Sequence, residues 1–183
     1  MNKLLESVFL FLLLSPINAL GQELYEQFPA EIQANQKYVF YAHGLIVEGD
    51  SQMPEHPEFG VYDFPSIKMK LFEMGGFNLI AHHRPKDTDV DGYVDLFASW
   101  VDSLLESGVP ASNITLIGFS RGSHLTALTA DRFNAYDINT VLMAGCFNGD
   151  MTFDEHFITT GLKHGAFYTP LEAWLRHIRD WIN

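Results

Sequence analysis

The sequence predicts an α/β fold built around a mostly parallel β-sheet. Short apolar runs bounded by turn residues alternate along the chain with segments whose apolar residues recur at the helical spacing. Such runs suit strands that are buried on both faces of a parallel sheet, with helices in the crossover connections. The two patterns together predict a three-layer sandwich in which helices cover both faces of the sheet.

Five strands are expected, four strongly apolar and a weaker fifth. They lie at residues 37–43, 77–82, 114–119, 140–145 and 156–160. With strands numbered along the chain, we expect the spatial order 2-1-3-4-5. A long irregular loop, residues 47–64, follows the first strand, and long loops in compact domains tend to be functional.

Helical patterns lie between and after these strands. In residues 93–108 apolar side chains recur at the helical spacing, and Gly108 ends the run. A second helix is expected in residues 123–133. The last segment, residues 169–182, opens with Thr169 as an N-cap ahead of an apolar face. We see no internal repeat and no interdomain linker, so residues 22–183 are expected to form a single domain.

The N-terminal segment, residues 1–21, has the layout of a secretory signal peptide. It carries one lysine, then an unbroken apolar run at 8–14, then small residues that make cleavage plausible after Ala19 or Gly21. The apolar run is too short to span a bilayer. We therefore expect export to the periplasm or the extracellular space, with no membrane span after cleavage. An uncleaved membrane anchor is the alternative.

Composition limits the partners. The 183 residues include 47% apolar and 19% charged residues, typical of a globular protein, and the formal net charge is −12. That charge argues against nucleic acid or an anionic membrane as a partner. Cys146 is the only cysteine, so no internal disulfide forms, and no spaced cluster of ligands supports a metal. We expect no cofactor and a small-molecule partner; the oligomeric state stays open.

The segment "LIGFSRGSH", residues 116–124, places Ser120 between Gly118 and Gly122. This is the G-x-S-x-G pattern of a nucleophile elbow, where a sharp strand-to-helix turn exposes a serine hydroxyl above the sheet edge. An apolar strand precedes it and a helical pattern follows it, which is the context that the motif requires. The alternative interpretation is a serine that only caps the following helix.

A second turn, His43-Gly44, ends the first predicted strand. In esterases of this architecture such a turn supplies one backbone amide of the oxyanion hole, and the residue after the nucleophile supplies the other. The candidate donors are therefore Gly44 or Leu45 together with Arg121. We interpret His43 as a strand-end histidine bonded to nearby backbone rather than as the general base.

Arg84 follows the second predicted strand at the same sheet edge. We interpret it as the structural salt-bridge partner of Asp87 or Asp89, which lie within reach in the sequence. Binding of a substrate anion is the alternative.

Several segments together resemble the α/β-hydrolase superfamily from about residue 37 to residue 181. More narrowly, the chain is similar to small exported bacterial α/β-hydrolase-like proteins of undefined substrate. The matching pieces are "YAHGLIVEG", "HRPKDTD", "GVPASNITLIGFSRGSH", "VLMAGC" and "TGLKHGAFYTPLEAW". The resemblance implies Ser120 as nucleophile and His164, between the last strand and the last helix, as general base.

This chain departs from the α/β-hydrolase pattern at the third catalytic residue, the acid that orients the histidine. Relatives carry a further strand before the histidine, ending in an aspartate, but here only "FNGDMTFDEHFI" separates Cys146 from Thr159. That is too short for a helix, a strand and their turns, so one strand of the usual fold is expected to be missing. Asp150 is the first candidate for the acid; Asp154 and Glu155 are weaker ones.

Three functional interpretations remain open. The first is a serine hydrolase, an esterase-type acyl hydrolase of carboxylic esters, that uses Ser120, His164 and Asp150. The second is a Ser–His pair that works without an acid, at a cost of about 10⁴ in turnover in a serine protease. The third is a catalytically impaired α/β-hydrolase-like protein that binds a small ligand.

Overall fold

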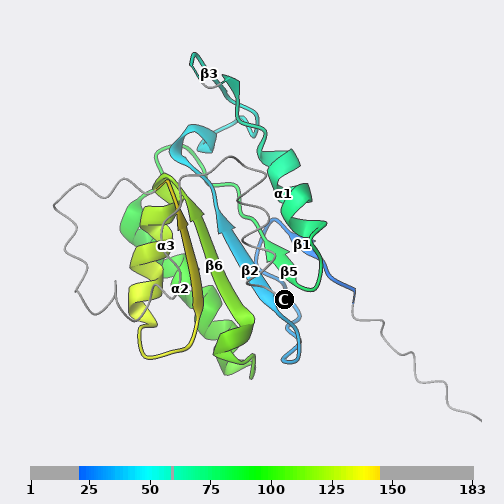
Figure 1. Ribbon diagram of the computed structural model, residues 1–183. Coiled ribbons are helices and arrows are strands. Elements are labelled where there is room, and N and C mark those ends of the chain that lie inside the picture. The colour runs from blue at the N-terminus through cyan, green and yellow to red at the C-terminus, as the bar shows by residue number, and fades with distance from the viewer. Residues whose placement is uncertain (1–20, 59, 145–183) are drawn as a thin grey trace, which may run out of the picture.

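The structure is a computed structural model that describes residues 21–58 and 60–144. Within these residues the chain is α/β, with a five-stranded parallel sheet and α-helices on both of its faces (Figure 1). The arrangement is compatible with a three-layer α/β fold. The strands, in spatial order, are β1 (Leu24–Tyr25), β5 (Asn78–Ile80), β2 (Tyr38–Ala42), β6 (Ile114–Phe119) and β7 (Asn139–Met143). The α-helices are α1 (Phe64–Phe72), α2 (Val90–Glu106) and α3 (Arg121–Arg132).

Four of the predicted strands are confirmed in their positions and in their relative order. Strands β5, β2, β6 and β7 lie side by side in parallel pairs, which gives the expected order of second, first, third and fourth. The structure adds β1 beyond β5, also parallel. The fifth predicted strand at 156–160, the helix at 169–182 and residues 1–20 of the signal peptide lie outside the described residues.

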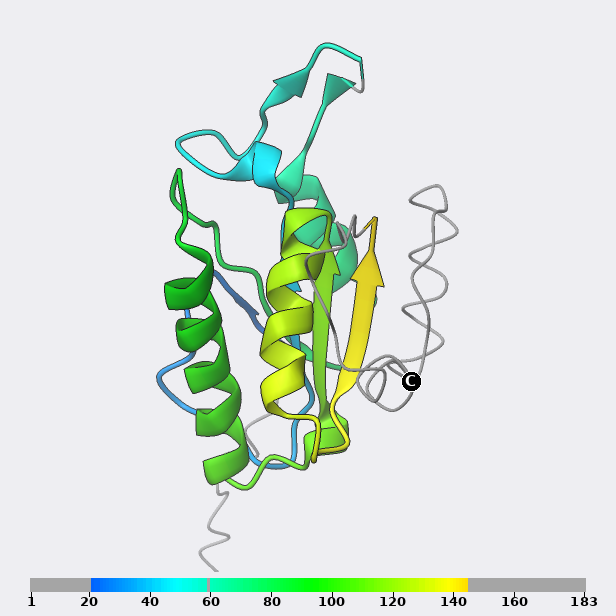
Figure 2. The ribbon, with the colours of Figure 1, turned by 90° about the vertical axis from the view of Figure 1, so that its left-hand side faces the viewer.

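Strand β2 shows why the apolar runs do not alternate with polar residues. All five of its residues are buried. Phe40 belongs to the core cluster under α2 and α3, whereas Val39 and Tyr41 belong to the cluster under α1. Figure 2 shows α2 and α3 on one side of the sheet and α1 on the other. A strand covered on both faces must be apolar throughout.

The ends of the helices follow from capping residues. Asp63 accepts a hydrogen bond from the Ser66 amide at the start of α1, at 2.9 Å, and Asp89 does the same for the Gly92 amide at the start of α2, at 2.7 Å. Gly108, with φ of 85°, follows the C-cap of α2, which confirms its predicted role as the helix stop.

Neither α1 nor any other helix of the described residues is long and apolar enough to cross a membrane.

The loops after the parallel strands meet at the carboxyl edge of the sheet. The long loop at 47–64 contains a short antiparallel hairpin, β3 (Glu55–His56) and β4 (Gly60–Val61), preceded by the 3-10 helix η1 (Leu45–Val47). Figures 1 and 2 show this hairpin projecting beyond the carboxyl edge, above the ends of β2 and β6. Another 3-10 helix, η2 (Ala111–Asn113), lies at the opposite edge, directly before β6.

Candidate functional site

Ser120 lies in the one-residue turn between β6 and α3, as the sequence predicted. Its backbone has φ of 53° and ψ of −120°. A residue with a side chain rarely adopts a positive φ, and such a conformation costs about 1–3 kcal/mol. Strained backbone of this kind clusters at active sites and ligand clamps. This strained turn lies at the carboxyl edge of the sheet, where β6 ends and α3 begins.

The Ser120 hydroxyl does not cap α3. Ser120 occupies the N-cap position, but its side chain makes no capping hydrogen bond. Its backbone is instead fixed on both sides: the amide donates to the Met143 carbonyl at 2.8 Å, and the carbonyl accepts from the Ser123 amide at 2.9 Å. The side chain is half-buried. These contacts argue against the interpretation that Ser120 serves only as a helix cap.

The two glycines of the motif are required by close backbone contacts. A Cβ atom on Gly118 would lie 2.5 Å from the Ser123 Cα atom, and one on Gly122 would overlap the carbonyl groups of Ala42 and His43. Real Cβ atoms do not approach other atoms so closely. The first turn of α3 can therefore pack against the end of β6 only because Gly118 lacks a side chain, and against the end of β2 only because Gly122 lacks one.

Ser123 holds the same turn together from inside. It is fully buried, and its Oγ atom lies 2.7 Å from the Gly118 carbonyl oxygen and 2.6 Å from the Met143 carbonyl oxygen. The Met143 amide also donates to Ser123 Oγ, at 2.9 Å. No pattern in the sequence assigns a role to Ser123. Its place one helical turn after Ser120 was the only available signal.

The His43-Gly44 turn lies directly against Ser120. A Cβ atom placed on Gly44 would lie 3.5 Å from Ser120 Cβ and 3.3 Å from Phe119 Cδ1. Leu45 is the first residue of η1, and Arg121 is the first residue of α3. The first amides of a helix have no acceptor within that helix. Leu45 and Arg121 directly follow the two residues in contact, Gly44 and Ser120, so two helix starts lie beside each other here.

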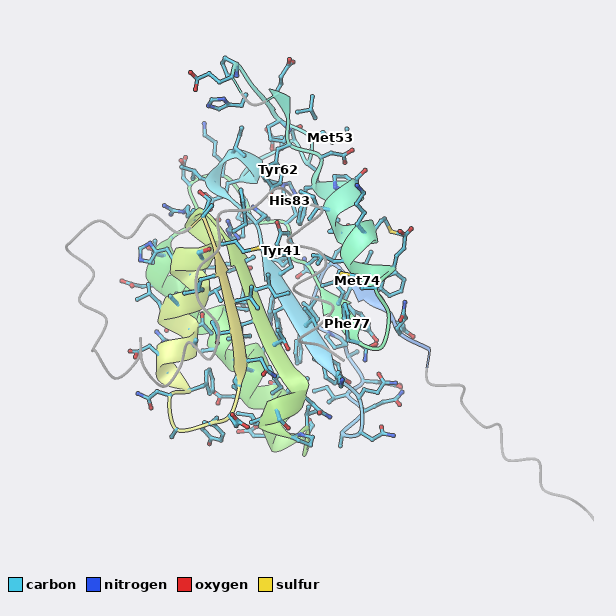
Figure 3. All side chains as sticks on the ribbon, in the orientation of Figure 1. Tyr41, Met53, Tyr62, Met74, Phe77 and His83 are labelled. Carbon is cyan, nitrogen blue, oxygen red and sulfur yellow. The ribbon has the colours of Figure 1, made fainter. Side chains whose placement is uncertain are left out.

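Tyr62 packs over this junction. Its ring lies 5.7 Å from the Phe119 ring, and its hydroxyl lies 2.8 Å from the Tyr41 hydroxyl. Burial raises the pKa of Tyr62 to about 12, while the Tyr41 hydroxyl and the Gly44 amide act in the opposite direction. The Gly44 amide thus faces a neutral phenol oxygen. Figure 3 shows Tyr41 and Tyr62 towards the carboxyl edge, together with His83.

His43 is structural, which confirms the interpretation from the sequence. It is fully buried, and its Nε2 atom accepts a hydrogen bond from the Arg84 amide at 2.9 Å. The proton must then be on Nδ1, which donates to the Gly44 carbonyl at 2.8 Å. Burial, assisted by the Arg84 charge, lowers the pKa of His43 to about 3. The ring is neutral and has no nitrogen left to accept a proton from Ser120.

The expected salt bridge of Arg84 forms, but the predicted partners were wrong. Arg84 is fully buried and its Nε atom donates to Glu48 Oε1 at 3.1 Å. Asp87 and Asp89 are exposed, and Asp89 caps α2 instead. Arg121 Nε lies 3.1 Å from the same Glu48 oxygen. The sequence carries no signal for Glu48 as the partner, because it lies in the irregular loop, far from both arginines along the chain.

The adjacent histidines after β5, His82 and His83, have different partners in the protein. His83 Nε2 lies 2.7 Å from the Val47 carbonyl oxygen, whereas the His82 ring stacks on Tyr93 at 5.8 Å between centroids. Burial lowers the pKa of His82. Residues 21–58 and 60–144 contain no group of three or more histidine, cysteine, aspartate or glutamate side chains placed to hold a metal ion.

Of the predicted catalytic groups, the structure positions Ser120 together with Gly44, Leu45 and Arg121. The predicted base His164 and the candidate acids Asp150, Asp154 and Glu155 lie outside the described residues. No protein-family model matches the chain, and no curated protein matches it.

Proposed function

We propose that the chain is a serine hydrolase of the α/β-hydrolase type that cleaves carboxylic esters, with Ser120 as its nucleophile. The observation that carries this proposal is the backbone of Ser120, with φ of 53° and ψ of −120°, between two glycines that leave no space for a side chain. A fold gains no stability from a strained serine whose hydroxyl caps nothing. The cost is accounted for if the hydroxyl must stand exposed at the sheet edge.

The proposed reaction proceeds through an acyl-enzyme. Ser120 Oγ attacks the ester carbonyl carbon while His164 takes the hydroxyl proton. The tetrahedral intermediate collapses, and the alcohol leaves with the proton from His164. A water molecule, deprotonated by the same imidazole, then releases the carboxylic acid and restores Ser120. Asp150 orients His164 in this scheme and stabilises the imidazolium.

The oxyanion of the intermediate binds to the amides of Leu45 and Arg121. Gly44 and Leu45 are the two candidate amide donors at the His43-Gly44 turn. Leu45 is favoured because the Gly44 amide faces the Tyr62 hydroxyl. Arg121 begins a helix of 12 residues, so the partial positive charge of the α3 N-terminus adds to its amide. Such preorganised donors are worth about 10²–10³ in turnover each.

The proposed location is outside the cytoplasm, after cleavage following Ala19 or Gly21. The proposed reaction uses only protein groups and water. A small-molecule ester is the proposed substrate class.

Hydrolysis of p-nitrophenyl acetate by the purified protein tests the proposal. We expect Ser120→Ala to lower turnover by about 10³-fold or more, since the nucleophile is lost. Ser112→Ala is the matched control, because Ser112 is exposed at the opposite edge of the sheet. Equal turnover in Ser120→Ala and the wild type would reject Ser120 as the nucleophile. A wild type without turnover that still binds a small ligand would favour the ligand-binding alternative.

A further inference from the structure

Glu48 is a buried carboxylate between two arginines. Only 2% of its side chain is exposed, and its Oε1 atom is 3.1 Å from Nε of both Arg84 and Arg121. Burying the charges of Glu48 and Arg84 is costly unless their arrangement is fixed. The chain has a net charge of −12, and most aspartates and glutamates of the described residues are exposed, so this one requires a specific explanation.

Glu48 belongs to the same short turn as the Leu45 amide. It is the C-cap of η1, and its own amide donates to the Leu45 carbonyl at 2.9 Å. One 3-10 turn therefore carries a proposed oxyanion donor at its start and the buried carboxylate at its end. A displacement of the carboxylate displaces the Leu45 amide with it.

The partner across the site is the side chain of the other proposed donor. Arg121 contacts Glu48 through Nε, and its Nη2 atom donates to the Thr88 carbonyl at 2.9 Å. The residue that offers its backbone amide is thus held at its side chain by two separate loops. The ion pair between Glu48 and Arg121 joins the two halves of the proposed oxyanion hole.

Arg84 binds the turn that contains Glu48 through its side chain and its backbone. Its side chain donates to Glu48 and to the His43 carbonyl, and its backbone carbonyl accepts from the Gly49 amide at 3.2 Å. The turn that contains Glu48 is therefore held to the loop after β5 at both ends. The remaining freedom of the carboxylate is small.

The charges of this cluster distinguish two possible roles. Two guanidinium groups and one carboxylate leave one net positive charge beside Ser120, with His43 neutral. Removing the Glu48 charge would raise this to two positive charges. If the cluster acted only through its charge, that change would stabilise an oxyanion further and raise turnover. If it acts by position, the same change would lower turnover.

We propose that Glu48 is a positioning residue of the oxyanion hole, whose carboxylate sets the spacing of the Leu45 and Arg121 amides. This inference rests on the proposed function. Glu48 itself contacts neither substrate nor the reacting atoms in this account.

The test compares Glu48→Gln with Glu26→Gln in the full chain. Glu26 is the matched control because it pairs with another buried cation, Lys68 on α1, at 2.6 Å, and contacts neither Arg84 nor Arg121. For each variant we would measure kcat and KM for p-nitrophenyl acetate, the inhibition constant of a phenyl trifluoromethyl ketone, and the melting temperature. The ketone forms a tetrahedral adduct with a serine nucleophile, so its affinity reports on the oxyanion hole.

We expect Glu48→Gln to lower kcat by about 10- to 100-fold, with KM within about twofold, because a misplaced donor weakens binding of the transition state only. Ketone affinity should fall by the same factor, and Glu48→Asp should restore part of both. Glu26→Gln should change the melting temperature alone. Unchanged or raised kcat in Glu48→Gln would overturn the inference and leave the proposed function intact.

Arg121→Lys provides a second route if Glu48→Gln does not fold. The Arg121 side chain is 29% exposed, so its replacement disturbs the core less. Lysine keeps the charge but cannot reach Glu48 and Thr88 with one planar group. The same loss in kcat and in ketone affinity is expected, and normal values would overturn the inference. A wild type that neither turns over ester nor binds the ketone would overturn the proposed function and this inference together.

Discussion

The two edges of the parallel sheet differ in the side chains and backbone conformations that close their turns. At the amino edge, neutral amide groups close the turns: Asn113 Nδ2 donates to the Gln36 carbonyl at 3.3 Å, and Asn139 Nδ2 donates to the Ser112 carbonyl at 3.0 Å. Such bonds satisfy backbone carbonyls at little cost. Among the described residues, these turns place no charged side chain in the interior.

The carboxyl edge contains strained backbone and buried charge. Ser120 and Ala144 both have positive φ there, and Glu48 and Arg84 are almost completely buried. In the described residues, five buried side-chain atoms lack a hydrogen-bond partner, and four of them belong to this edge: Glu48 Oε2, His82 Nδ1, Arg84 Nη1 and Arg121 Nε. Buried polar atoms without hydrogen bonds destabilise a fold, although Arg121 Nε keeps its ion pair with Glu48 at 3.1 Å.

The contrast supports the proposed site at the carboxyl edge. Both edges close the same strands, so connecting the chain does not by itself require the costly arrangement. Local strain and unsatisfied polar groups are expected where a site must be held in one geometry. Substitutions at each edge should therefore differ in their effect on the free energy of unfolding.

The largest effect is expected from Gly122→Ala. A Cβ atom at this position would overlap backbone carbonyls of β2, which cannot move without displacing the strand. We expect the free energy of unfolding to fall by more than about 4 kcal/mol, or the protein not to fold. Gly60→Ala in the projecting hairpin is the control: no atom lies within 4 Å of its Cβ position, so only the φ of 72° should cost stability, about 1–2 kcal/mol. Urea unfolding of both variants measures the difference; similar losses would contradict the close packing.

Arg84→Met should have the next largest effect. The substitution leaves the Glu48 carboxylate buried without its better hydrogen-bond partner, and leaves the His43 carbonyl without the guanidinium. Breaking a buried pair from one side costs about 3 kcal/mol or more. Thermal and urea unfolding would reveal it. A loss below about 1 kcal/mol would show that the cluster is not part of what holds the edge together.

His43 predicts how stability depends on pH. Burial lowers its pKa to about 3 from 6.5, so the unfolded chain binds a proton below about pH 6.5 that the folded chain excludes. The contribution of the neutral His43 ring to the free energy of unfolding is fully present above about pH 6.5. It is lost as the pH falls towards 3, by roughly 1.4 kcal/mol per pH unit. Burial also lowers the pKa of His82 and His124, which acts in the same direction.

Unfolding by urea at about pH 7, 6 and 5 measures this slope. His43→Gln keeps a polar group in place but cannot titrate, so its stability should change less with pH than that of the wild type. Parallel slopes for the two proteins would contradict the neutral, buried His43.

The smallest effect is expected from Asn139→Ala at the amino edge. It removes neutral hydrogen bonds to the carbonyls of Ser112 and Ile114, at 3.0 and 3.3 Å. Such bonds contribute about 1 kcal/mol, and water can replace them at a partly exposed site. Ester turnover should be unchanged. A loss of activity in this variant would remove the distinction between the two edges.

The sequence predicted the features whose signals are local. The buried strands β2, β5, β6 and β7 are continuous apolar runs, and the glycine spacing around Ser120 specifies its turn within five residues. Strand β1 was missed because two residues carry no pattern. Helix α1 was missed because it begins at the end of the irregular loop.

The supporting residues of the site had no local signal. Glu48 reaches Arg84, which is 36 residues away in the sequence, and Tyr62 reaches Tyr41 across 21 residues. Only the folded sheet edge brings such residues together. The prediction for Arg84 failed for the same reason, because the nearest acids in sequence, Asp87 and Asp89, face solvent.

The most direct test of the central claim is the reaction of the purified protein with a fluorophosphonate probe, followed by mass spectrometric mapping of the adduct. The account predicts one adduct, on Ser120, that is absent from Ser120→Ala and present at wild-type level in Ser112→Ala. Fully buried Ser123, three residues further on, should remain unmodified. An unmodified wild-type protein, or an adduct on any serine other than Ser120, would contradict the claim that Ser120 is a catalytic nucleophile.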